Sequence, residues 1–124
     1  MFKGLRQLFS RIFQKDKPRI VLEQDGFSLF DDGGRLFLVK WSEVLEVFGF
    51  KEDWGTVDCI CLGFRVSDDG TFHEVNEEMP GWEHLVKELD RVFPNTTKDW
   101  WKTVAFPAFA TNRTTIWGKG QSEP

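Results

Sequence analysis

The sequence predicts a single α+β domain, an antiparallel meander of about six or seven short strands capped by one amphipathic helix. Short apolar runs alternate with Asp-Gly and Gly-Gly turn signals, and one run with helical spacing follows them. With 40% hydrophobic and 15% aromatic residues, a chain of 124 residues can fill one core. We therefore expect one domain over residues 18–117, after a basic N-terminal helix (1–17) and before a flexible tail (118–124).

Residues 1–17 have the pattern of a basic amphipathic helix, which Pro18 ends. Their apolar residues fall within an arc of about 140° at helical spacing, with cations at its edges. This stripe fits an anionic membrane surface, the domain's own sheet or another protein, and the sequence leaves all three open. The membrane-surface candidates are Phe2, Lys3, Leu5, Arg6, Phe9, Arg11, Phe13 and Lys15.

The expected strands are short runs rich in β-branched and aromatic residues, each bounded by turn residues. They cover Arg19–Gln24, Phe27–Phe30, Arg35–Trp41, Val44–Phe50, Val57–Val66 and Thr71–Asn76. Lys51–Gly55 is polar and is expected to be a loop. In the longest run, Leu62 and Phe64 share one face, so Cys59 and Cys61 point the other way.

The spacing then changes to that of a helix. Apolar residues recur every three or four positions from Trp82 to Phe93, and Pro94 ends the pattern. We also expect a short helix over Lys98–Val104 and a last short strand over Thr114–Trp117.

The net charge of −4 is unevenly distributed. Residues 1–19 hold six Lys and Arg and one Asp, whereas residues 20–124 hold 10 Lys and Arg and 19 Asp and Glu. Residues 20–124 are acidic enough to repel phosphate backbones, which argues against nucleic acid as a partner. The same acidic residues attract a basic protein instead.

No motif in the sequence points to catalysis. Cys59 and Cys61 are expected to be structural thiols in a reducing, cytoplasmic compartment, because a zinc site needs four ligands and no other Cys is present. We therefore expect no metal and no cofactor. His73 with Glu74 and Glu77 offers an imidazole near carboxylates, but no nucleophile accompanies it.

Tryptophan is the other unusual feature. Two adjacent Trp residues cannot share one helix face, so Trp100 or Trp101 is expected to be partly exposed. Exposed Trp residues are frequent energetic centres of protein interfaces. The partner-binding candidates are Trp54, Trp100, Trp101, Glu74, Glu77 and Glu78.

Two short segments, Asp25-Gly26-Phe27 and Trp41-Ser42-Glu43-Val44, together with the order of six strands and a helix, resemble a bacterial pleckstrin-homology-like domain over about residues 19–93. The resemblance implies a barrel or a strongly bent sheet capped by the helix. The chain departs from that pattern by continuing about 30 residues beyond the helix. Its first hairpin loop, Gln24-Asp25-Gly26, lacks the Lys or Arg of a phosphoinositide site.

These observations lead to one functional expectation and two alternatives. We expect a non-catalytic interaction module that binds a protein partner through an acidic, Trp-bearing surface, for example an immunity protein that neutralises a basic partner. One alternative is a peripheral membrane adaptor anchored by residues 1–17. The other is a small enzyme that uses His73 with nearby carboxylates.

Overall fold

The computed structural model describes residues 18–55, 57–106 and 112–119. The predicted helix over 1–17, with all of its membrane-surface candidates, lies outside the described residues, as does most of the predicted tail. The membrane alternative therefore stays a prediction. Among the described residues, no helix has the length and apolar character needed to cross a membrane.

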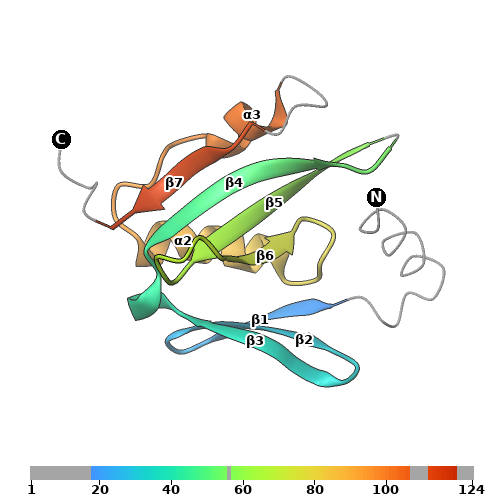
Figure 1. Ribbon diagram of the computed structural model, residues 1–124, viewed down its shortest axis with the longest axis vertical. Helices are drawn as coiled ribbons and strands as arrows, with labels where there is room; N and C mark the ends of the chain where they lie inside the picture. Colours follow the sequence, from blue (N-terminus) through green and yellow to red (C-terminus); the bar gives the residue numbers. More distant parts are fainter. Residues whose placement is uncertain (1–17, 56, 107–111, 120–124) are drawn as a thin grey trace.

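The described strands form two antiparallel sheets, one above the other in Figure 1. The first has the order β1-β2-β3, comprising Arg19–Glu23, Gly26–Asp31 and Gly34–Lys40. The second has the order β6-β5-β4-β7. Its strands in chain order are β4 (Glu46–Asp53), β5 (Asp58–Arg65), β6 (His73–Asn76) and β7 (Thr114–Gly118).

Two helices follow β6 and precede β7. Helix α2 (Trp82–Val92) lies behind the four-stranded sheet, and the shorter α3 (Trp100–Ala105) lies near β4 and β7 (Figure 1). The side chains of Leu85 and Leu89 on α2 join the main core, as the amphipathic spacing predicts.

The α+β class and the antiparallel strands are confirmed, but a closed barrel is wrong. The chain leaves the first sheet through a short 3-10 turn at Trp41–Glu43, and the described strands β3 and β4 belong to different sheets. Lys51–Asp53, expected to be a loop, continues β4 because each of its residues pairs with a residue of β5.

The core lies between the two sheets and the helices. Phe27 and Val39 of the first sheet are fully buried in it, as are Leu62 and Phe64 of the second. This confirms the face that the alternation in β5 predicted. We call this side of the four-stranded sheet its inner face.

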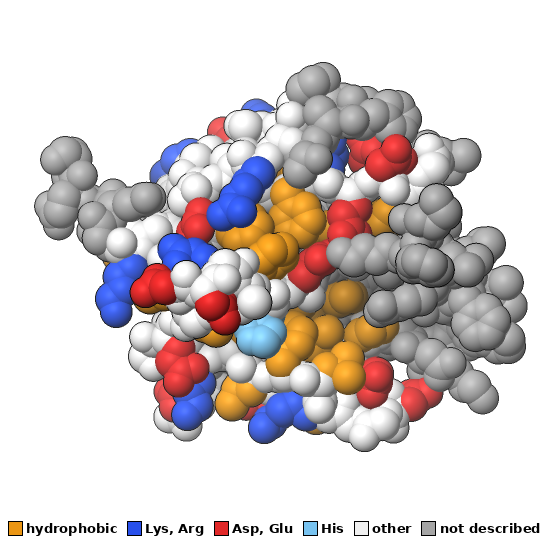
Figure 2. Space-filling view, viewed as in Figure 1, with side chains coloured by type: hydrophobic (Ala, Val, Ile, Leu, Met, Phe, Trp, Pro, Cys, Tyr) orange, Lys and Arg blue, Asp and Glu red, His pale blue; other side chains and the backbone are white. Residues whose placement is uncertain are grey.

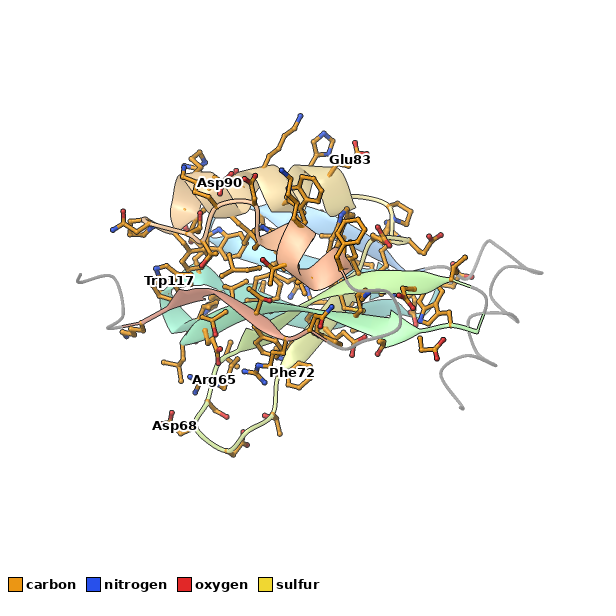
Figure 3. All side chains as sticks on the ribbon, turned by 90° about the horizontal axis from the view of Figure 1, so that it is seen from above. Arg65, Asp68, Phe72, Glu83, Asp90 and Trp117 are labelled. Carbon is orange, nitrogen blue, oxygen red and sulfur yellow. The ribbon has the colours of Figure 1, made fainter. Side chains whose placement is uncertain are left out.

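The opposite side, the outer face, carries Phe48 and Phe50 of β4 and Cys59 and Cys61 of β5. Phe50 pairs with Cys61, and Phe48 and Cys59 share their face because side chains two residues apart in a strand point the same way. The ring of Phe72 packs there, 5.0 Å from Phe48 and 6.0 Å from Phe50 between ring centroids. Figure 3 shows Phe72 on the side of the sheet away from α2. Figure 2 shows apolar side chains gathered on this face, with acidic and basic side chains beside them.

Phe48 is held in place from both sides. A Cβ on Gly63 would lie 2.3 Å from the Phe48 ring, so only glycine leaves room for the ring over β5. The guanidinium of Arg113 lies 3.7 Å from the ring centroid as a cation–π partner. The ring is thereby buried on a face that has no helix packed on it among the described residues.

Glu46 is an acceptor shared by β5 and the segment that contains β7. Its carboxylate accepts hydrogen bonds from Arg65 Nε at 3.2 Å, from Arg113 at 3.0 Å and from Thr115 Oγ1 at 2.9 Å. Burial raises the pKa of Glu46, but the hydrogen bonds from Thr115, Arg113 and Arg65 outweigh burial. The pKa of Glu46 therefore lies below its ordinary value of 4.5.

Replacing Glu46 by Gln is expected to make folding less sensitive to acid. A carboxyl whose pKa falls on folding stabilises the protein above the unfolded value of 4.5 and loses that contribution as the pH falls through the folded value. Urea unfolding between about pH 7 and about pH 3 measures this. The stability difference between wild type and Glu46→Gln should shrink below pH 4.5. A constant difference would contradict this account.

Candidate functional site

Six carboxylates gather at one end of the four-stranded sheet. The β4–β5 hairpin closes there at the Asp53–Asp58 pair, and β6 ends beside it because Asn76 pairs with Cys61. We call this group the acidic end, defined as Glu52, Asp53, Asp58, Glu74, Glu77 and Glu78. Lys51 is the one Lys or Arg within residues 51–58 and 73–78.

The hairpin turn presents Trp54 and Val57 at this end. The Trp54 N–H donates to the Val57 carbonyl at 2.9 Å, and Gly55 adopts a φ of +92° that suits glycine. The indole Nε1 of Trp54 donates to Glu52 Oε1 at 3.3 Å, while Val57 is exposed. The turn therefore offers an amphipathic ring and an apolar side chain between carboxylates.

The acids after β6 are fixed by backbone hydrogen bonds. The Ile60 N–H donates to Glu77 Oε2 at 3.0 Å, and the Glu77 N–H donates to the Ile60 carbonyl at 3.0 Å. The Glu78 N–H donates to Asn76 Oδ1 at 3.0 Å. Both carboxylate-bearing residues are exposed, so their charges face solvent from an ordered backbone.

The single amine of the acidic end points to the inner face. Lys51 Nζ lies 3.0 Å from Asp58 Oδ2 and donates to the Ala105 carbonyl at 2.8 Å. This buried ion pair ties the end of α3 to β4. It neutralises one carboxylate on the inner side and leaves the exposed acids Asp53, Glu77 and Glu78 on the surface.

The Trp pair of α3 divides as expected. Trp101 is 47% exposed, whereas Trp100 is buried and packs over Gly49 of β4. A Cβ on Gly49 would lie 3.0 Å from both Trp100 and Val104, so the glycine permits the close approach of α3. Of the two rings, Trp101 is the one available for a surface contact.

His73 is not brought together with the carboxylates. It pairs with Phe64 and stacks on the Phe37 ring, with 4.4 Å between ring centroids, at the rim of the inner face. Glu74, the next residue in the strand, points to the outer face. Glu77 lies beyond the strand, where it accepts from Ile60.

The structure brings together a cluster that the sequence did not indicate. One ligand atom each of Glu52, Cys61 and Glu74 lies within 4.8 Å of the others. Its members come from three strands, so no local spacing marks it. The sequence predicts a purely structural role for Cys61, and it does not single out Glu52 as a candidate residue.

The thiol of this cluster is held in its neutral form. Interaction with the Cys59 side chain, burial, and the nearby charges of Glu52 and Glu74 raise the pKa of Cys61. Both thiols are buried and unbridged. At neutral pH Cys61 therefore keeps its proton unless a positive charge takes its place.

Comparisons with protein-family models, with curated proteins and with solved structures find no match to this chain.

Proposed function

We propose that this protein is a non-catalytic interaction module that binds a basic protein through its acidic end. The observation that carries the proposal is the end of the sheet where the exposed acids Asp53, Glu77 and Glu78 lie and where the Trp54 indole donates to Glu52. Charges of one sign on an ordered frame raise the association rate of an oppositely charged partner. Trp54 and Val57 supply the apolar contact that charge alone does not give.

Neutralisation of a basic partner, as an immunity protein performs it, is the specific form that we favour. Such a role needs fast capture and little rearrangement of the binding surface. Hydrogen bonds from backbone N–H groups to side-chain oxygens support the second requirement, because they fix the hairpin turn at Asp53 and Gly55 and the segment at Glu77 and Glu78. Trp101, which is exposed on α3, is a second candidate contact.

The pleckstrin-homology-like resemblance forms part of the proposal. Two antiparallel sheets followed by α2 support it. The α3–β7 segment is an addition, since β7 occupies the edge of β4. In the proposed module this addition covers the edge of β4, and the acidic end remains the recognition surface.

Removing two charges at the acidic end is expected to weaken partner binding. Affinity capture with the full chain identifies the partner, and titration with the purified partner then gives the dissociation constant. We expect Asp53→Asn with Glu78→Gln to weaken binding by about threefold to tenfold at low salt, mainly through slower association. Both replacements retain a side-chain oxygen, and the Asp53 oxygen is needed for the bond from Gly55.

The matched control is Glu83→Gln with Asp90→Asn on α2. It changes the net charge by the same amount on the side of the molecule opposite Phe72 (Figure 3). We expect it to leave the dissociation constant within about twofold of wild type. Equal weakening by both variants would show that net charge alone acts. Binding that does not weaken with added salt would also contradict the proposal.

A further inference from the structure

We propose that Glu52, Cys61 and Glu74 form a three-donor binding site for a divalent metal ion of the zinc class. The proposal does not depend on the partner proposed above. It goes against the expectation, drawn from the two cysteines alone, that no metal is bound.

The strand register creates the site. Cys61 lies on β5, the strand between β4 and β6, with its side chain on the outer face. Glu52 approaches it diagonally from β4, since Glu52 pairs with Cys59. Glu74 approaches diagonally from the other side, since Glu74 pairs with Gly63 and Asn76 pairs with Cys61. Their ligand atoms meet within 4.8 Å over the central strand.

The donors suit zinc better than a hard cation. Zinc takes thiolate and carboxylate ligands together in four-coordinate sites, whereas calcium and magnesium take oxygen alone. One sulfur and two carboxylate oxygens match the zinc sites in which three protein ligands leave the fourth position open. Cys59 lies outside this set, and its thiol donates to the Ile60 carbonyl at 3.8 Å.

The electrostatics of the cluster favour a cation. Two carboxylates converge to within 4.8 Å of each other and of a fully buried thiol. Like charges at this separation repel, and a divalent ion between them turns the repulsion into attraction. When the ion binds, a metal–sulfur bond replaces the S–H bond of Cys61, and its proton leaves to solvent.

The frame of the site is rigid. All three donors lie within paired strands, and ligands on regular elements hold their geometry better than ligands on loops. The indole of Trp54 also donates to Glu52 at 3.3 Å, which orients one ligand from outside the cluster. The site therefore has its donors in place on three neighbouring strands.

Cobalt(II) titration of the reduced full-length protein tests the proposal. Cobalt substitutes for zinc and gives a thiolate-to-metal charge-transfer absorption in the near ultraviolet when sulfur coordinates it. The chain holds two Cys, so this absorption reports on Cys59 and Cys61 alone. We expect it to saturate at one cobalt per chain and to disappear on addition of one equivalent of zinc.

Single variants then identify the ligands. Cys61→Ser should reduce the cobalt affinity by at least about tenfold, and Glu52→Gln and Glu74→Gln should do so while keeping side-chain size. Glu78→Gln is the control, since Glu78 lies at the acidic end but outside the cluster, and its affinity should equal that of wild type. If Cys61→Ser fails to fold, the two Glu→Gln variants decide.

Three results would overturn the proposal. The first is the absence of charge-transfer absorption in the wild-type protein. The second is its persistence at full strength in Cys61→Ser with loss in Cys59→Ser, which would move the site to Cys59. The third is equal affinity of wild type, Glu52→Gln and Glu74→Gln, which would show a dithiol that binds metal without the carboxylates.

Discussion

Replacing Phe27 by Ala is expected to lower the free energy of unfolding by about 3–5 kcal/mol. Phe27 is 0% exposed, and its ring centroid lies 4.8 Å from that of Phe64, 5.6 Å from the Trp41 ring and 6.2 Å from the Phe37 ring. The contact with Phe64 joins the two sheets. The substitution therefore removes packing on both sides of the core and leaves a cavity.

Urea unfolding followed by tryptophan fluorescence measures this change, with the slope of the transition as a check that two-state behaviour persists. Phe72→Ala is the matched control, because Phe72 is 41% exposed. Its truncation should cost about 1 kcal/mol or less, since part of the ring is already in water. Equal losses for the two variants would mean that the inter-sheet core does not depend on Phe27.

Replacing Lys51 by Met is expected to cost about 3–5 kcal/mol, although Met has a similar length. The Lys51 side chain is 2% exposed and that of its partner Asp58 is 15% exposed. Removing the ammonium leaves a largely desolvated carboxylate facing the inner side, and the Ala105 carbonyl loses its donor. The loss of stability therefore comes more from the largely desolvated Asp58 carboxylate, which no longer has the Lys51 ammonium beside it, than from the lost attraction of the ion pair.

The double variant Lys51→Met with Asp58→Leu separates these two contributions. Replacing both partners of a buried ion pair by apolar groups is often nearly neutral. We expect the double variant to recover most of the stability lost in Lys51→Met, as measured by the same urea unfolding. If the double variant is no more stable than Lys51→Met, the charge of Asp58 is not the source of the loss. The lost hydrogen bond from Lys51 to the Ala105 carbonyl of α3 must then account for it.

The order of the elements could be predicted from the sequence because their signals are local. Turn residues and the change from strand to helical spacing locate every described strand and both described helices, from Arg19 to the last strand at Thr114–Gly118. The prediction failed at Lys51–Asp53, where charged residues continue a strand. There a distant element, α3, supplies the acceptor that makes a buried lysine tolerable.

The candidate site shows the same limit. Trp54, Glu77 and Glu78 could be chosen from their types, but only the register shows that the hairpin turn and the end of β6 are neighbours. The cluster of Glu52, Cys61 and Glu74 could not be predicted, because diagonal contacts across three strands depend on pairings that residue spacing does not encode.

The position of β7 has a consequence for the order in which the chain folds. Its last residue, Gly118, pairs with Glu46, and the chain between them contains two strands and both described helices. During synthesis the hydrogen-bonding groups on that side of β4 therefore stay unpaired until residues 114–118 have emerged. Such long-range pairing slows folding, and the exposed strand is meanwhile open to association with other nascent chains.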